Sequence, residues 1–166
     1  MRYFIIIRGP AGVGKSTITK KISELLNRDY FSFDEIMKKN KLDIIQGDGI
    51  SAENFVKANE LIIPEARKKL ENNEIVIFDG CFYRKKQLEH LEKNLPYDHY
   101  IFSLKAPLKD CFVRNKTRGA PMTKRAIKEV FLLVSKLDMG IEIETSNKSV
   151  TEVINDIIKH LPIGNN

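Results

Sequence analysis

The chain has 166 residues, 42% of them hydrophobic, with a formal net charge of +6. This length suits one domain, no apolar run is long enough to cross a bilayer, and the apolar start is too short for a signal peptide, so we expect a cytoplasmic protein. Cys81 and Cys111 form no C-x-x-C motif and the three histidines are scattered, which favours reduced thiols and no metal cluster. The basic charge suits anionic ligands, nucleic acid included, without choosing among them.

The first predicted unit is a strand, a loop and a helix. Residues 3–7 are apolar and rich in isoleucine, as in a strand buried on both faces. The next segment fills the pattern G-x-x-x-x-G-K-[ST] with Gly9, Gly14, Lys15 and Ser16. A helix is predicted after it, because apolar residues recur on one helical face: Ile18, Ile22, Leu25 and Leu26.

This order of elements is the one that a phosphate-binding loop requires. Glycines let successive backbone N–H groups turn toward a phosphate, and the helix N-terminus adds its dipole. Lys15 would place its charge on the β- and γ-phosphates, and the Ser16 hydroxyl would be a ligand of Mg²⁺. We therefore predict ATP and Mg²⁺ as cofactors, bound by Gly9, Pro10, Ala11, Gly12, Val13, Gly14, Lys15, Ser16 and Thr17. The alternative is an ordinary glycine-rich turn with a solvated Lys15.

Strands and helices alternate along the rest of the chain. Strands are predicted at residues 30–34, 74–79, 99–104 and 140–145, and helices at about 51–70, 84–94, 107–118, 122–137 and 149–161, with Pro64 interrupting or kinking the first of these. Residues 38–54 are polar, carry two glycines and are predicted to be an exposed, mobile connection. The alternation predicts an α/β fold with a parallel sheet, helices on both faces and ligands at the carboxyl ends of the strands.

Two acids follow predicted strands at that edge. Asp79 ends the apolar run "IVIFD", where a carboxylate can reach Mg²⁺ or its waters beside Ser16; the alternative is a helix cap or a turn former. Asp34 is predicted to act as a base or to position an acceptor hydroxyl; the alternative is an N-cap for the residues after it.

Arginines are predicted around the transferred group. Arg114 and Arg118 are four residues apart on one helical face, and Arg125 follows the break at residues 119–121, which indicates a short lid over ATP at about residues 114–125. A solvated basic face is the competing interpretation for Arg118 and Arg125. Arg84 could bind an anionic acceptor or simply begin a helix.

Together these features resemble the small P-loop kinases. The resemblance rests on the P-loop, the acid after the second strand, "FDG" after the third, and an R-x-x-x-R helix before a short lid, and it covers nearly the whole chain. The superfamily includes nucleoside monophosphate, shikimate and gluconate kinases, chloramphenicol phosphotransferase, zeta toxins and the kinase domain of polynucleotide 5′-kinase. It implies one three-layer P-loop domain over residues 1–166, with about five parallel strands and a substrate-binding helical region at about 38–73.

The resemblance also implies a function and an acceptor side. It implies transfer of the γ-phosphoryl group of MgATP to a small-molecule or nucleotide acceptor, with Lys15, Asp34, Arg114 and Arg118 as catalytic residues. Asp34, Arg67, Gly80, Arg84 and Arg125 are the expected acceptor-binding residues, Arg67 being the one arginine in residues 38–73.

Three other functions are weighed against this one. In a polynucleotide 5′-hydroxyl kinase an arginine follows the base, where Met37 and Lys38 stand here. A GTPase-type switch would need an acid at Arg118 and a glycine at Phe82. The last alternative is a non-catalytic ATP-binding module.

Overall fold

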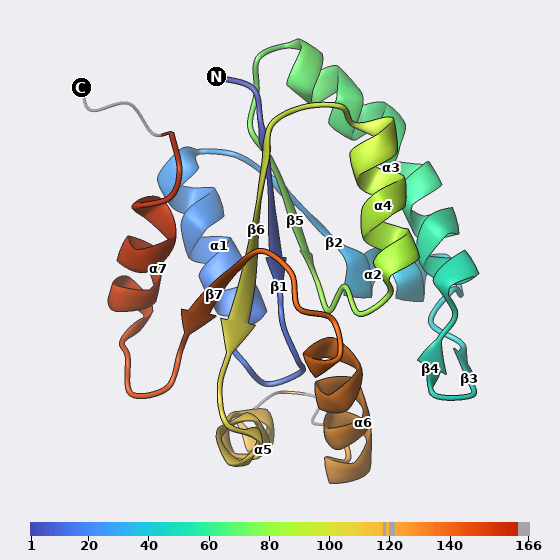
Figure 1. Cartoon of the computed structure of the whole chain (residues 1–166), viewed down its shortest axis with the longest axis vertical. Helices are drawn as coiled ribbons and strands as arrows, with labels where there is room; N and C mark the ends of the chain where they lie inside the picture. Colours follow the sequence, from blue (N-terminus) through green and yellow to red (C-terminus); the bar gives the residue numbers. More distant parts are fainter. Residues whose placement is uncertain (118, 120–121, 163–166) are drawn as a thin grey trace.

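The computed structural model describes residues 1–117, 119 and 122–162, and its core is a five-stranded parallel sheet (Figure 1). The sheet has the order β2-β5-β1-β6-β7. Its strands are β1 (Phe4–Arg8), β2 (Tyr30–Ser32), β5 (Val76–Gly80), β6 (His99–Lys105) and β7 (Ile141–Glu144). The predicted α/β architecture is therefore confirmed.

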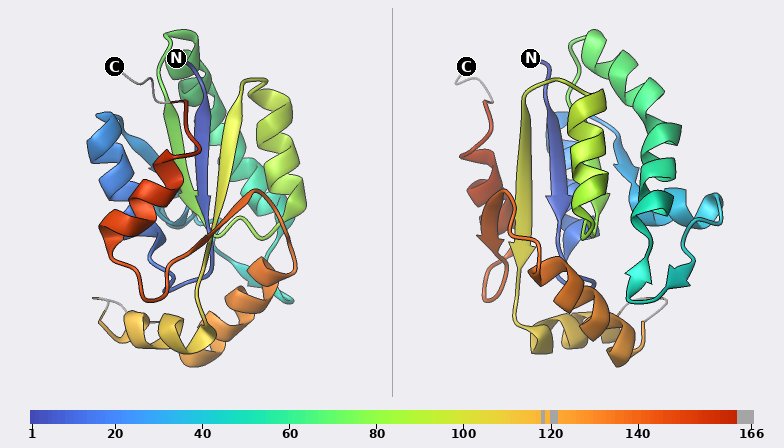
Figure 2. Two further views of the ribbon diagram at one scale, coloured as in Figure 1. Left: turned by 60° about the vertical axis from the view of Figure 1, so that its left-hand side comes forward. Right: turned by 45° about the vertical axis from the view of Figure 1, so that its right-hand side comes forward.

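Helices cover both faces of the sheet because the side chains of its central strand alternate between two apolar cores. Phe4 and Ile6 of β1 belong to one core, which α3 (Ala52–Glu71), α4 (Lys85–Asn94) and α2 (Phe33–Lys39) cover. Ile5 and Ile7 belong to the other, under α1 (Lys15–Leu26) and α7 (Val150–Ile158). Figure 2 shows these two helical layers on either side of the strands.

The second strand is shorter than predicted. β2 ends at Ser32, and α2 begins at Phe33, so Asp34 lies in a helix and not in a strand. Ser32 is the N-cap: its side chain accepts a hydrogen bond from the backbone N–H of Glu35 at 3.4 Å. Asp34 and Glu35 place negative charge in the first turn, which complements the helix dipole. This capping outweighs the alternating pattern that predicted a strand.

Residues 38–54 contain a small hairpin where a mobile connection was predicted. Its strands are β3 (Ile45–Gln46) and β4 (Gly49–Ile50), joined through Gly47, whose φ is +67°. Two contacts tie the hairpin to the segment after β5. The backbone N–H of Ile50 donates to the Tyr83 hydroxyl at 2.9 Å, and Arg84 Nε donates to the Ile50 carbonyl at 2.9 Å.

The long helix α3 continues through Pro64, where an interruption or a kink was predicted. Pro64 has no N–H to donate to the carbonyl of Glu60, but both residues are exposed, so water can hydrate that carbonyl. The buried face of the helix is unbroken, with Ala58, Ile62 and Ala66 among its core residues. Packing of that face explains why the proline is tolerated.

Helices α5 (Leu108–Lys116) and α6 (Lys124–Ser135) flank the predicted lid segment. The Thr123 side chain accepts from the backbone N–H of Ala126 and caps α6. The Asn115 side chain joins the two helices, since it donates to the Met122 carbonyl at 2.9 Å and accepts from the Met122 N–H at 3.0 Å. Across the described ranges, every helix is too short or too polar to cross a bilayer.

Candidate active site

The glycine-rich loop lies at the carboxyl end of β1, between β5 and β6, and leads directly into α1 (Figure 1). Gly12 and Gly14 have φ of +81° and +106°, which L side chains rarely adopt. A Cβ on Gly12 would also lie only 2.4 Å from the Cys111 carbonyl oxygen of α5, whereas one on Gly14 would meet open space. The loop therefore needs both glycines, Gly12 for two reasons.

Lys15 lies at the start of α1 and is 7% exposed. Its Nζ donates to the Pro10 carbonyl at 3.0 Å, so the side chain folds back across the loop. Burial raises the pKa of Asp79 and of Cys81, and the positive charge of Lys15 acts against both rises. The ammonium therefore lies beside both side chains. The predicted phosphate-binding lysine thus lies over the loop and near Asp79, the acid next to the end of β5.

Ser16 and Asp79 are brought together as predicted. Ser16 Oγ donates to Asp79 Oδ2 at 3.4 Å, and Asp79 is 4% exposed. Burial raises the pKa of Asp79; Lys15 and the hydroxyls of Ser16 and Thr19 oppose the rise, and the Asp34 charge adds to it. The surroundings thus disfavour the ionised form of this carboxylate, and a further cation would reduce that free-energy cost.

These two residues fit Mg²⁺. Asp79 Oδ1 is buried and makes no hydrogen bond among the described residues, so it offers a free acceptor to a metal or to a metal-bound water. Within that same part of the chain, no three His, Cys, Asp or Glu side chains are grouped closely enough to hold a metal ion. A hydroxyl with one carboxylate matches a magnesium ion whose other ligands are phosphate oxygens and waters.

Asp34 reaches the same edge of the sheet from α2. Its side chain is exposed, and its charge raises the pKa of Asp79 and of Cys81. The structure therefore places Asp34 near the loop and the metal-site acid, although from a helix. Cys81, two residues after Asp79, is a free cysteine; burial raises the pKa of its thiol, which disfavours the reactive thiolate.

Arg114 contacts the loop from α5. Its Nη1 donates to the Val13 carbonyl at 2.9 Å and to Thr145 Oγ1 at 2.9 Å, and its Nη2 donates to the Thr145 carbonyl at 3.0 Å. The guanidinium thus ties the loop to the segment after β7. Arg118, the second predicted arginine of this pair, lies outside the described residues.

Arg84 binds the hairpin. Its guanidinium contacts the Asp48 carboxylate at 2.6 Å, lowers the pKa of that carboxyl, and lies over the Tyr83 ring with Cζ 5.1 Å from the ring centroid. Arg84 is also the N-cap residue of α4. Both predicted alternatives, a cation facing an acceptor and the start of a helix, remain compatible with this position.

Of the other predicted acceptor residues, Arg67 and Arg125 make contacts elsewhere, whereas Gly80 ends β5 beside the start of the loop. Arg67 donates to the Asn94 carbonyl at the end of α4, which precedes β6 and so lies at the opposite edge of the sheet. Arg125 is 89% exposed in its side chain and pairs with Glu129 one helical turn along α6. Gly80 is buried, and a Cβ there would lie 3.1 Å from the Phe33 Cβ and from the Phe82 ring, so it serves packing.

Sequence reasoning missed Arg8 and Thr145. Arg8 is 0% exposed and directly precedes the loop, and a charged residue ending the apolar run "FIII" was the available signal. Thr145 Oγ1 donates to the Val13 carbonyl at 3.3 Å and to the Lys105 carbonyl at 3.0 Å. No sequence pattern marked Thr145, because its partners are distant in the chain.

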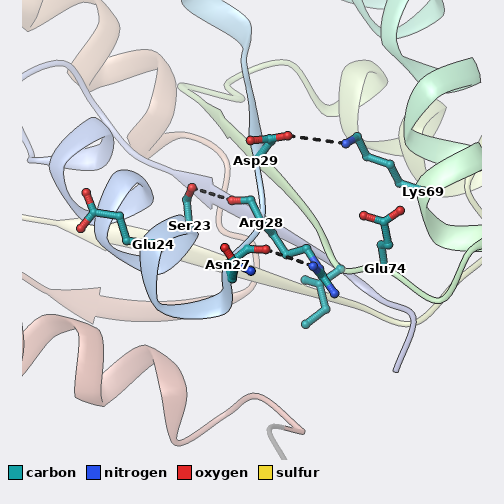
Figure 3. Close-up of a pocket in the computed structure, with 8 residues that line it drawn as sticks. Ser23, Glu24, Asn27, Arg28, Asp29, Lys69 and Glu74 are labelled. Carbon is teal, nitrogen blue, oxygen red and sulfur yellow. Dashed lines mark hydrogen bonds and ion pairs between the residues drawn. The ribbon is translucent and has the colours of Figure 1, made fainter.

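A polar hollow of about 420 Å³ lies elsewhere on the molecule (Figure 3). It is lined by Ser23, Glu24, Asn27, Arg28, Asp29, Lys69, Glu74 and Ile75. These residues end α1 or precede β2 and β5, so the hollow is at the amino edge of the sheet, away from the glycine-rich loop. Its cations, Arg28 and Lys69, lie among three carboxylates, so it is no anion site.

Comparison with known proteins supports this interpretation of the loop. A family model described as an AAA domain matches residues 5–132. A putative adenylate kinase of Pyrococcus furiosus is 27% identical over 168 aligned residues, which cover 96% of this chain and 84% of that protein.

Solved structures show the same fold at low identity. A sugar kinase from a Janibacter species superposes with a TM-score of 0.80 at 15% identity, covering 99% of this chain and 96% of that one. A gluconokinase from Sinorhizobium meliloti gives 0.66 at 14% identity, with 95% and 90% covered. A shikimate kinase from Acinetobacter baumannii, in complex with shikimate, gives 0.61 at 17% identity, with 96% and 92% covered.

Proposed function

The chain belongs to the AAA domain family and has the fold of the small P-loop kinases, and from this premise we propose that it is a kinase. It transfers the γ-phosphoryl group of MgATP to a small-molecule or nucleotide acceptor. The observation that carries the proposal is the meeting of Lys15, the Ser16–Asp79 pair and Asp34 at one edge of the sheet.

On the nucleotide side, the backbone N–H groups of the loop and the N-terminus of α1 bind the phosphates. Lys15, already beside the loop, neutralises charge on the group being transferred. Ser16 and Asp79 would hold Mg²⁺ directly or through water, and the ion would offset negative charge on the phosphates. Arg114 keeps the loop in register through the Val13 carbonyl.

On the acceptor side, Asp34 orients the attacking hydroxyl and takes its proton. Its exposure leaves the carboxylate accessible to an acceptor hydroxyl. Arg84 follows Asp79 by five residues and is the described cation nearest to it in sequence. An anionic group of the acceptor can displace the Asp48 carboxylate and bind the Arg84 guanidinium in its place. An acceptor with a hydroxyl and one anionic group satisfies both residues.

A polynucleotide acceptor fits less well. A duplex or a strand is bound through several phosphates at once, which needs clustered free cations. Many lysines here instead pair with neighbouring carboxylates: Lys21, Lys69, Lys85, Lys86, Lys105, Lys148 and Lys159. These carboxylates offset the charge that the paired lysines would offer to a nucleic-acid backbone.

The proposal is tested by measuring ADP release with MgATP and a panel of acceptors: nucleosides, nucleoside monophosphates, hydroxy acids, sugars and 5′-hydroxyl oligonucleotides. We expect one small-molecule class to stimulate release and to yield a phosphorylated product. Asp34→Asn should bind MgATP as the wild type does and lose transfer by about 10²-fold or more. Glu35→Gln, a change at the exposed neighbour in the same turn, is the control. Stimulation by oligonucleotides alone, or an Asp34→Asn variant with full turnover, contradicts this assignment.

A further inference from the structure

Arg8 is a buried cation at the end of β1, immediately before the loop. Its side chain is 0% exposed, and in the part of the chain that the structure describes no carboxylate lies within ion-pair distance of it. A buried charge without an ion pair must be held by neutral acceptors. Arg8 is in register with Gly80, the last residue of β5, and with Ser103 of β6, so it lies where β1 and β5 end beside β6.

Four oxygens from three separate segments accept from this guanidinium. Nε donates to the Phe82 carbonyl at 3.3 Å, and Nη1 donates to Ser103 Oγ at 2.8 Å. Nη1 also donates to the Leu137 carbonyl at 3.0 Å, and Nη2 donates to the Val134 carbonyl at 3.1 Å. The last two carbonyls belong to the C-terminal end of α6 and the residues after it, where a cation also complements the helix dipole.

Phe82 shows why the first of these contacts matters. It is a bulky residue with φ of +47°, a conformation that costs free energy and persists only where its surroundings enforce it. Its ring is fully buried and lies edge-to-face on Phe33 at 4.9 Å, and its carbonyl is held by Arg8. This strained residue stands between Asp79 and Arg84 and sets the path of the turn that joins them.

Ser103 extends the same network. Its hydroxyl accepts from Arg8 and donates to the Met139 carbonyl at 2.5 Å. Residues 134–139 are therefore fixed at three carbonyls, two by Arg8 directly and one through Ser103. One guanidinium thus joins the strand before the loop, the turn after β5 and the connection from α6 to β7.

We propose that Arg8 is a positioning residue for the metal side of the active site, acting through the strained turn at Phe82 to hold Asp79 opposite Ser16. This inference rests on the proposed nucleotide site but not on the identity of the acceptor. Lysine cannot replace the arginine, because an ammonium lacks the planar fork that reaches acceptors on three segments.

The test measures how strongly Mg²⁺ improves ATP binding, by titration calorimetry with MgATP and with ATP in EDTA. We expect Arg8→Lys to reduce the ratio of the two affinities at least 5-fold, while metal-free ATP binds within 2-fold of the wild type. Arg67→Lys is the matched control, since Arg67 also donates to a backbone carbonyl but at the other edge of the sheet; its ratio should not change. Amide hydrogen exchange should also become faster in residues 80–86 of Arg8→Lys.

A second variant keeps the proposal testable if Arg8→Lys does not fold. Ser103→Ala removes one acceptor of Arg8 and the link to Met139, and we expect a smaller fall in the same affinity ratio, about 2- to 3-fold. An unchanged ratio in whichever of the two variants folds overturns the positioning role and leaves Arg8 as a core contact. If the wild type binds MgATP with a strong Mg²⁺ effect yet phosphorylates no acceptor, the kinase proposal fails while this inference can still be decided.

Discussion

Gly12 and Gly14 show how two similar residues of one loop are constrained differently. Both have positive φ, so a side chain at either position strains the backbone. Only at Gly12 does the Cys111 carbonyl also occupy the place of a Cβ. The motif marks both glycines in the same way, whereas the contact with α5 that distinguishes them exists only in the folded chain.

We expect Gly14→Ala to lower the free energy of unfolding by about 1–3 kcal/mol, the usual cost of strained backbone. Gly12→Ala should cost clearly more, because α5 must also move away from the loop. Urea unfolding of the two variants measures the difference. Equal losses would mean that α5 yields without cost and that the close contact with Cys111 has no energetic role.

The carboxylate of Asp79 is predicted to destabilise the nucleotide-free protein, although it offers an oxygen to a metal ion. Burial raises its pKa above the ordinary aspartate value of 3.8, so the folded state binds a proton more readily than the unfolded state. The ionised carboxylate therefore destabilises the nucleotide-free protein above its folded pKa, and this penalty disappears as the pH falls below 3.8. We expect Asp79→Asn to raise the melting temperature at pH 7–8 and to lose that advantage near pH 4.

The control is Asp156→Asn, for which we expect the opposite change in melting temperature. Lys148 and Lys159 lower the pKa of Asp156 to about 2, so Asp156→Asn should lower the melting temperature at neutral pH. Calorimetry of both variants between pH 4 and 8 checks the pair. A lower melting temperature for Asp79→Asn at neutral pH would mean that Lys15 compensates the carboxylate fully.

At the scale of elements, the sequence predicted where most helices and strands lie and failed where short-range capping competes with periodicity. The alternating residues 30–34 fit a strand, but Ser32 caps a helix that starts at Phe33. The hairpin at residues 45–50 was missed, because it is held by Tyr83 and Arg84 from a distant segment. Local patterns carry no information about such anchors.

The hairpin offers a prediction about Arg84. Arg84→Ala removes the contacts with Ile50 and Asp48, so amide exchange in residues 45–50 should become at least 10-fold faster. If an anionic acceptor uses this guanidinium, its KM should rise by a similar factor while the KM for ATP does not change. Lys86→Ala, which breaks only an exposed ion pair with Glu53, is the control. A rise in acceptor KM without faster exchange would separate acceptor binding from hairpin anchoring.

For the whole molecule, the sequence was sufficient for the fold and for the proximity of Ser16 to Asp79. Apart from the β3–β4 hairpin and the α5–α6 pair, strands and helices alternate, and a parallel sheet then puts Ser16, Asp34 and Asp79 at one edge. The sequence was less informative about the acceptor side. Arg67 and Arg125 were proposed as acceptor-binding residues from their positions in the chain, but their side chains contact Asn94 and Glu129. The direction of a long side chain depends on packing partners that composition and spacing do not specify.

Nucleotide binding should stabilise the entire domain. At 100 times its Kd, MgATP adds about 2.7 kcal/mol to the free energy of unfolding. For a domain of this size that corresponds to a rise of about 5–10 °C in melting temperature. Lys15→Ala should remove most of the rise, and Lys20→Ala, an exposed lysine on the same helix, should keep it. An equal shift in both variants would exclude Lys15 from phosphate binding.

The order of the strands has a consequence for how the chain is made. β1 precedes β5 and β6 in the chain, yet it pairs with β5 at Val76 and with β6 at His99. Its apolar residues therefore leave the ribosome long before either neighbour exists, and the closing of such distant contacts slows folding. The segment Phe4–Arg8 is then open to chaperones or to other nascent chains until β5 and β6 have been translated. Truncations that end before β6 should leave β1 half-paired and aggregate rather than fold.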